Sequence, residues 1–227
     1  KTWLKKIKRI LTKEQKKFNI TLGGGDTTYS SKFVITIITI GYSKKKPVLR
    51  KGSNINDDIY LTGDIGDSFL GLSILKKNKN FGKMNKYFLK KYYSPILPIK
   101  FQPFLSSVAS SSIDISDGLA QDLKHLCRSS KHGAYIDLNL LPVSKNCKSL
   151  LNKKKVVLKN IFSKGDDYQI LFTAKSANRQ KINKISKKIN LKITKIGKIN
   201  NSRNIVFKYR NKEFHLKPKN MGYTHIF

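Results

Sequence analysis

The segment from residue 111 to residue 131 constrains the fold more strongly than any other part of the sequence. An apolar strand pattern ends at Asp114, and a helical pattern begins at Asp117 and puts Leu119, Leu123 and Leu126 on one face. A strand that passes into an amphipathic helix after so short a turn is typical of a domain in which the helix packs against a sheet.

Short strand and helix patterns alternate irregularly along the rest of the chain. Because this is not a strict βαβ series, we expect an α+β fold with a mixed or antiparallel sheet. The turn-rich residues 54–58 predict a boundary between two domains, residues 1–53 and residues 58–227. The predicted strands are residues 19–22, 33–42, 59–62, 134–140, 168–174, 191–199, 205–209 and 213–216, and the predicted helices are residues 1–18, 83–93 and 177–189, with another that opens at 63–68 and ends near 77.

The charge of the chain is strongly positive, with 47 Lys and Arg residues against 13 Asp and Glu residues and a formal net charge of +34. Such a balance can indicate nucleic-acid binding. However, only six of the basic residues are Arg, and the Lys residues are scattered over every segment. Base and phosphate recognition relies on Arg forks, so we expect no nucleic-acid partner. A positive field would still concentrate an anionic small substrate.

The sequence does not favour a membrane-spanning protein or a disulfide-linked one either. No apolar run approaches the roughly 18 residues of a membrane span. The lysine-rich residues 1–18 predict a surface helix packed on a core, with a membrane-surface helix as the alternative. Cys127 and Cys147 have no partner at disulfide or metal spacing, and Cys127 falls on an apolar helix face. We therefore expect no disulfide, a buried free thiol at Cys127 and a cytoplasmic protein.

The acidic residues are concentrated at turns. Eleven of the thirteen are Asp, and most lie at turns between strand and helix patterns, several of them beside Gly. Short carboxylates beside glycine suit a site for Mg²⁺ and phosphate. Helix capping is the alternative, with Ser116 as N-cap and Asp117 favoured by the helix dipole, but it leaves Asp114 unexplained. The turn at residues 23–28 fits either a phosphate contact or a side-chain hydrogen bond of Asp26, and it is not a Walker loop.

Six blocks of sequence, in order and over essentially the whole chain, resemble the thiamine-monophosphate kinases. They are GGDTT at 24–28, LRKG at 49–52, DIYLTGDIGDS at 58–68, IDISDGL at 113–119, SKGDDYQILF at 163–172 and GYTH at 222–225. The resemblance implies a fold shared with aminoimidazole ribonucleotide synthetase and selenophosphate synthetase. It makes residues 1–53 the C-terminal part of an ATP- and metal-binding domain that pairs in a homodimer, and residues 58–227 a C-terminal α+β domain.

The resemblance also implies an activity and its residues. The reaction would transfer a phosphoryl group from ATP to thiamine phosphate with several Mg²⁺ ions. The implied metal ligands are Asp26, Asp114 and Asp117; the ATP contacts are Gly25, Asp26, Arg50 and Ser116; the thiamine phosphate contacts are Asp166 and Tyr223; and the catalytic residues are Asp26, Arg50 and Asp117.

The chain departs from the family pattern in three places. Residues 164–169 read KGDDYQ where the family has GGEDYE, so Asp166 has a shorter reach and Lys164 replaces a residue that adopts positive φ easily. The pair Pro95 and Pro98 lacks the arginines that flank it in the family. The chain begins at Lys1, and the family carries further metal-binding aspartates upstream. We therefore expect these 227 residues alone to show little or no turnover.

Three alternatives remain open at this point. One is another ATP-dependent enzyme of the same superfamily, which substrate-dependent ADP release would separate. A second is a degenerate ATP-binding or partner-binding module, which the departures at Lys164 and Gln169 would explain. The third is a basic nucleic-acid-binding protein, which would bind oligonucleotides with a steep dependence on salt.

Overall fold

The chain forms two units, Lys1–Tyr42 and Ser43–Phe227. The computed structural model describes residues 2–43, 45–216 and 221–222, so Tyr223 lies outside the described residues. The predicted domain boundary at residues 54–58 stays a prediction.

The first unit contains one helix, α1 (Thr2–Phe18), which confirms the helical pattern there. No side chain of α1 is buried, and its Trp3 ring contacts Phe33 edge-on at a centroid distance of 5.2 Å. The strands predicted at residues 19–22 and 33–42 are wrong, since this unit has no strand in its described part. A strand needs a partner for its backbone hydrogen bonds, and no neighbouring segment of this unit supplies one.

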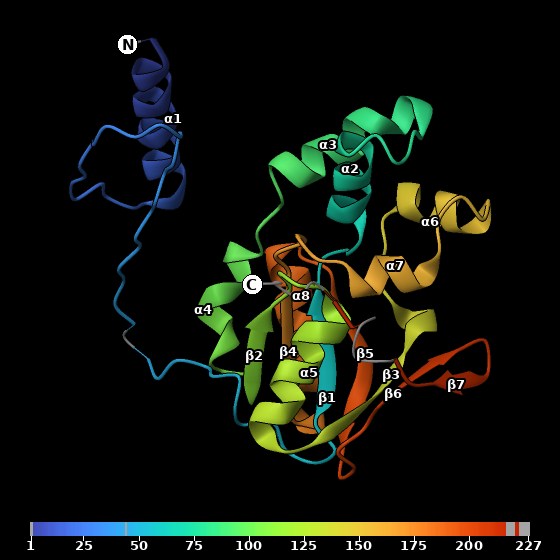
Figure 1. Cartoon of the computed structure of the whole chain (residues 1–227). Helices are drawn as coiled ribbons and strands as arrows, with labels where there is room; N and C mark the ends of the chain where they lie inside the picture. Colours follow the sequence, from blue (N-terminus) through green and yellow to red (C-terminus); the bar gives the residue numbers. More distant parts are fainter. Residues whose placement is uncertain (1, 44, 217–220, 223–227) are drawn as a thin grey trace. The chain divides into compact units, whose positions relative to one another are not determined.

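The second unit is built on a seven-stranded sheet in the order β2-β4-β1-β5-β3-β6-β7 (Figure 1). Neighbouring strands are antiparallel, except that β3 and β6 are parallel. The predicted α+β fold with a mixed sheet is confirmed. The strands are β1 (Asp58–Thr62), β2 (Ser111–Asp114), β3 (Gly133–Asp137), β4 (Ile170–Ala174), β5 (Ile193–Asn200), β6 (Ile205–Tyr209) and β7 (Lys212–Phe214).

Helices cover both faces of this sheet (Figure 1). Helix α5 lies on one face, where it contacts β2, β3 and β4, and α8 packs against β5 on the other. The patterns did not predict α4, α6 and α7. The helices are α2 (Asp67–Leu75), α3 (Asn85–Tyr93), α4 (Gln102–Leu105), α5 (Leu119–Ser130), α6 (Lys145–Asn152), α7 (Leu158–Ser163) and α8 (Arg179–Ile189).

The core is divided between the two faces by the alternation of side chains along β1. Ile59 and Leu61 belong to the cluster under α5, whereas Tyr60 belongs to the cluster under α8. There its ring stacks on Phe172 at 5.2 Å with an interplanar angle of 14°. All five residues of β1 are buried, as expected for a central strand covered on both faces.

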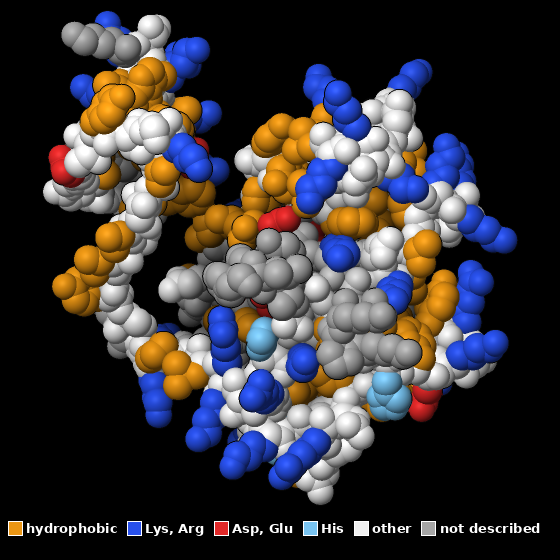
Figure 2. Space-filling model, viewed as in Figure 1, with side chains coloured by type: hydrophobic (Ala, Val, Ile, Leu, Met, Phe, Trp, Pro, Cys, Tyr) orange, Lys and Arg blue, Asp and Glu red, His pale blue; other side chains and the backbone are white. Residues whose placement is uncertain are grey.

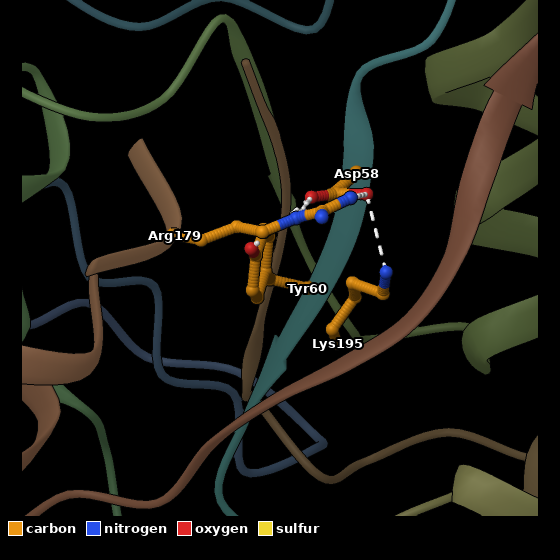
Figure 3. A network of polar contacts seen from close by, with 4 residues as sticks. All are labelled: Asp58, Tyr60, Arg179 and Lys195. Atoms are coloured by element: carbon orange, nitrogen blue, oxygen red, sulfur yellow. Dashed lines mark hydrogen bonds and ion pairs between the residues drawn. The ribbon is translucent and has the colours of Figure 1, made fainter. Parts of the chain in front are cut away.

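A polar network closes the end of the sheet that is opposite to Asp114. In the register of β4, Asp114 faces Ile170 while Asp58 faces Ala174. The Asp58 carboxylate is buried and accepts hydrogen bonds from Nε and Nη2 of Arg179, the latter at 2.9 Å, with Lys195 Nζ at 3.5 Å (Figure 3). Burial opposes ionisation of Asp58, but these cations outweigh it and lower its pKa.

Both cysteines are free and buried, which confirms the buried free thiol predicted at Cys127. Burial raises the pKa of each thiol to about 12, so neither Cys127 nor Cys147 is a reactive thiolate.

Lys and Arg side chains are spread over the visible surface rather than gathered in one patch (Figure 2). Among the described helices, not one combines the length and the apolar character that crossing a bilayer requires.

Candidate active site

Two acidic loops are joined at one end of the sheet. The first, residues 115–118, follows β2, and the second, residues 164–169, precedes β4. Ile115 N donates to Gln169 O at 2.8 Å, and Tyr168 N donates to Ile115 O at 2.8 Å. Asp166 N donates to Ser116 O at 3.0 Å. These bonds continue the pairing of β2 with β4 beyond the sheet and hold the two loops together.

Glycines allow the two loops to approach this closely. A Cβ on Gly165 would run into the carbonyl oxygen of Ser116. Gly118 has φ +113°, and a Cβ there would lie 2.7 Å from the carbonyl carbon of Ser163. Both positions therefore require the absence of a side chain, so the glycines of the two motifs serve the contact between the loops.

Left-handed backbone occurs in the second loop at residues other than Gly. Lys164 is extended, with φ −119°, so the family glycine that it replaces is not needed for positive φ here. Asp166 and Tyr168 instead have φ 70° and 51°. Such conformations cost on the order of 1 kcal/mol or more for residues with a side chain. They alternate with Asp167, which is buried between them.

Three carboxylates share the surroundings of Tyr168. Burial raises the pKa of Tyr168, and the charges of Asp166, Asp114 and Asp117 raise it further. The pKa of Asp166 is also raised, first by burial and then by the charge of Asp117. Asp114 is exposed, and Asp117 and Asp166 are half-buried, so all three are open to a ligand. The structure thus brings together three of the acids that the sequence selected.

The start of α5 differs from the sequence prediction. The N-cap is Gly118 rather than Ser116, and the helix begins at Leu119. The amides of Ser116, Asp117 and Gly118 each donate to Oδ2 of Asp122, at 3.1 Å in all three cases. The prediction that Ser116 caps the helix is therefore wrong, because the Asp122 carboxylate takes over that role from within the first turns.

Asp122 is buried close to two other acids. Burial raises its pKa to about 7; the charges of Asp117 and Asp114 add to the rise, and the backbone hydrogen bonds oppose it. These amides are thus occupied by a side chain of the chain itself.

Other turn acids have structural roles. The buried Asp167 accepts from Gly66 N at 2.8 Å at the start of α2, and burial raises its pKa to about 8. Asp67 accepts from Tyr87 Oη and Ser144 Oγ, each at 2.7 Å. Asp64 pairs with an exposed lysine. The prediction that acids at turns bind Mg²⁺ and phosphate is therefore too general, because these three acids have structural partners instead.

Arg50 lies elsewhere in the second unit. Ser112 N donates to Leu49 O at 2.9 Å, and Gly52 N donates to Ser130 Oγ at 3.0 Å. The backbone of Arg50 therefore lies beside the start of β2 and the C-terminal end of α5, whereas Asp117 precedes the other end of that helix. The predicted role of Arg50 with ATP stays a prediction.

The remaining predicted residues are in the first unit and at the C-terminus. Gly25 and Asp26 are exposed in the first unit, where Thr27 N donates to Asp26 Oδ1 at 2.7 Å. Their convergence with Asp114 and Asp117 stays a prediction. Tyr223 lies outside the described residues, but the preceding Gly222 is so close to the first loop that a Cβ on it would lie 2.7 Å from Asp117 O.

The acidic loops are compatible with Mg²⁺. Within residues 2–43, 45–216 and 221–222, no three Asp, Glu, His or Cys side chains form a ready-made metal cluster. Mg²⁺ usually takes only one or two carboxylates and completes its octahedral shell with water and substrate phosphates. The open carboxylates of Asp114 and Asp117 fit that kind of site.

Sequence reasoning missed two residues of this region. Asp122 has a signal that could have revealed it, since an acid in the first turns of a helix can accept from the amides that precede the helix. Tyr168 has no such signal, because its place among three carboxylates depends on the pairing of the two loops.

Solved structures with this fold identify its class. A thiamine-monophosphate kinase from Stenotrophomonas maltophilia K279a matches with a TM-score of 0.65 and 25% identity over 70% of this chain and 52% of that chain. AaThiL complexed with AMPPCP and TMP matches with a TM-score of 0.64 and 26% identity over 78% and 54%. HypE of E. coli, a hydrogenase maturation protein, shares the fold alone, with a TM-score of 0.56 and 10% identity over 78% of this chain and 53% of that chain. The protein is therefore of the synthetase-like α+β class that includes these kinases and HypE.

Sequence relatives narrow the class to one family. The thiamine-monophosphate kinase of Buchnera aphidicola from Acyrthosiphon pisum is 37% identical over 220 residues, which are 91% of this chain and 67% of that protein. That of Haemophilus influenzae is 34% identical over 87% of this chain and 60% of that protein. No protein-family model matches the sequence. The chain belongs to the thiamine-monophosphate kinase family and spans about two thirds or less of the length of these relatives.

Proposed function

We propose that this protein transfers the γ-phosphoryl group of ATP to thiamine phosphate and so forms thiamine diphosphate. The observation that carries the proposal is the junction of the two acidic loops, which gathers Asp114, Asp117 and Asp166 at one end of the sheet. A similar solved structure is complexed with AMPPCP, which is an ATP analogue, and with TMP. That pair of ligands is the one that this reaction needs.

Asp114 and Asp117, with Asp26 from the first unit, are the proposed Mg²⁺ ligands. The first two are accessible, whereas Asp122 and Asp167 are buried and occupied by backbone amides. Mg²⁺ bound there would neutralise charge on the phosphate oxygens during transfer. Arg50, Ser116 and Gly25 are the further proposed ATP contacts.

The acceptor explains why no general base is needed. The attacking atom is a phosphate oxygen that is already ionised, so the site has to align two anions and offset their repulsion. Asp166 and Tyr223 are proposed to hold the cationic thiamine part of the acceptor, the carboxylate by charge and the ring by stacking. The positive surface would draw both anionic substrates towards the protein.

A homodimer and a cytoplasmic location are also part of the proposal. Residues 33–42 expose Ile37, Ile38 and Ile40 by 74 to 83% and have no strand partner in their own unit. Such a segment is suited to pairing with a second copy. The two free buried thiols suit a reducing compartment.

The degenerate-module alternative is less well supported. It depended on Lys164 and Gln169 as lost substrate groups, but Gln169 is buried and its side chain is used inside the fold. Its Oε1 accepts from Thr62 Oγ1 at 3.1 Å, and its Nε2 donates to Ile96 O at 2.8 Å. A structural use of this side chain is compatible with an active kinase.

The test incubates the purified protein with ATP, Mg²⁺ and thiamine phosphate and measures thiamine diphosphate by chromatography. We expect product only when all three are present. Because low turnover is expected for these 227 residues alone, Mg²⁺-dependent binding of AMPPCP is measured on the same preparation. The proposal would be overturned if this preparation shows neither product formation nor Mg²⁺-dependent nucleotide binding. ADP release without thiamine diphosphate would favour another enzyme of the superfamily.

A further inference from the structure

Three successive backbone amides converge on one carboxylate oxygen at the start of α5. The nitrogens of Ser116, Asp117 and Gly118 each lie 3.1 Å from Oδ2 of Asp122. Successive amides that point to one place form a concave binding site for anions such as phosphate. Here the chain supplies the anion itself, and Asp122 is only 2% exposed. We call this arrangement the amide pocket of residues 116–118.

The loop that forms the pocket is fixed from both directions. Its amides are taken by Asp122, while its carbonyl oxygens at Ile115 and Ser116 accept from Tyr168 N and Asp166 N. Little freedom is left to the backbone between the end of β2 and the start of α5. This backbone carries Asp114 and Asp117, so their separation depends on Asp122.

The charge of Asp122 is an unfavourable feature that calls for an explanation. Its carboxylate is buried near Asp114 and Asp117, and all three are acids. A neutral cap such as Ser or Asn would avoid this repulsion. One carboxylate oxygen of Asp122 accepts all three amides at once, which orders the loop more completely than a cap that accepts a single amide. The three hydrogen bonds that order the loop are thus kept in spite of the repulsion among the three carboxyl groups.

We propose that Asp122 is a positioning residue of the phosphoryl-transfer site. It fills the amide pocket, fixes Asp114 and Asp117 for binding of a divalent cation, and keeps substrate phosphate out of the pocket. Phosphate then meets this loop through the cation and the side chains rather than through the amides. This inference rests on the proposed function, because it assumes a metal at Asp114 and Asp117.

The test titrates the purified chain with Mn²⁺ alone and follows free Mn²⁺ by electron paramagnetic resonance. Removing a residue that orients metal ligands typically weakens metal binding by about 10- to 100-fold, and we expect this for Asp122→Ala. Asp122→Asn keeps an acceptor oxygen without the charge, so its Kd should stay within about threefold of the unchanged protein. Sodium formate, a free carboxylate that fits the vacated pocket, should restore part of the affinity of Asp122→Ala.

The matched control is Asp137→Ala. Asp137 also accepts a backbone amide, from Asn139 N at 2.9 Å, but at the end of β3. Its removal should leave the Kd for Mn²⁺ unchanged. Circular dichroism of each variant shows whether it is folded, and if Asp122→Ala does not fold, Asp122→Ser takes its place in the Mn²⁺ titration and in the formate experiment.

The outcomes separate this inference from the proposed function. An unchanged Kd in a folded Asp122→Ala would overturn the positioning role alone. Equal weakening in Asp122→Asn and Asp122→Ala, with no effect of formate, would also overturn it, because charge rather than geometry would then be responsible. Failure of the unchanged protein to bind Mn²⁺ would overturn the proposed metal site and this inference with it.

Discussion

The amide nitrogen of Asp166 donates a hydrogen bond to the carbonyl oxygen of Ser116, 3.0 Å away, although the two residues are far apart in the sequence. Through this bond, the loop after β2 and the loop before β4 act as one structural element. The three open carboxylates are held by that junction rather than by either loop alone.

A methyl group at Gly165 should separate the two loops. In Gly165→Ala the new Cβ would run into Ser116 O, a backbone atom that cannot move alone. Overpacking of this kind costs about 1–3 kcal/mol of unfolding free energy, measurable by urea denaturation. The same variant should bind Mn²⁺ more weakly. Gly41→Ala, where a Cβ would have no neighbour within 4 Å, should change neither quantity, and wild-type behaviour of Gly165→Ala would contradict the junction.

Asp117→Asn should weaken metal binding without unfolding the protein. The Asp117 side chain is half-buried, and the backbone amide of Asp117, not its carboxylate, makes the bond to Asp122. Loss of one carboxylate from a Mg²⁺ site should raise the Kd for Mn²⁺ by about tenfold or more. The melting temperature should change little. If Asp117→Asn binds Mn²⁺ as tightly as the unchanged protein, Asp117 is not a metal ligand.

The network around Asp58 should give a stability difference that depends on pH. The pKa of Asp58 is held below its usual 3.8 in the folded chain, so the ionised form stabilises the fold. This contribution is fully present above about pH 4 and is lost as the pH falls through the folded-state pKa. Arg179→Gln should therefore lower the unfolding free energy more at about pH 7 than at about pH 3.

Urea titrations of Arg179→Gln at both pH values measure this difference. The exposed Arg203 provides the control, since Arg203→Gln should have little effect at either pH. An equal loss at both pH values would show that Arg179 acts by packing of its aliphatic stem instead.

Phe172→Ala should destabilise the second unit strongly. Phe172 is fully buried, with ring centroids of Tyr60 and Phe101 at 5.2 and 5.1 Å. Deleting such a ring leaves a cavity and costs about 3–5 kcal/mol. The midpoint of urea unfolding measures the loss. Val157→Ala, at a side chain that is 61% exposed, should stay within about 0.5 kcal/mol, and a similar small effect at Phe172 would contradict the core described under α8.

Local patterns were sufficient to predict the strands and the longer helices of the second unit and part of the site. The apolar periodicity predicted α5 and α8, and the strand that ends at Asp114 is where the sequence placed it. Helices α6 and α7 escaped because they are only eight and six residues long, so each shows about two turns or less of a helical pattern. The strand pattern of residues 33–42 failed because a strand exists only with a partner.

The sequence by itself determined the residue types of the site and the order of its motifs along the chain. Carboxylates beside glycines at turns were sufficient to select Asp114, Asp117 and Asp166, because their chemistry is local. Only the tertiary structure decided that β2 pairs with β4, which brings the first two of these acids beside the third. It also decided that Asp122 fills the amide pocket while Asp167 and Asp67 hold α2. Each of these depends on hydrogen bonds whose partners are set by chain packing, which no local pattern encodes.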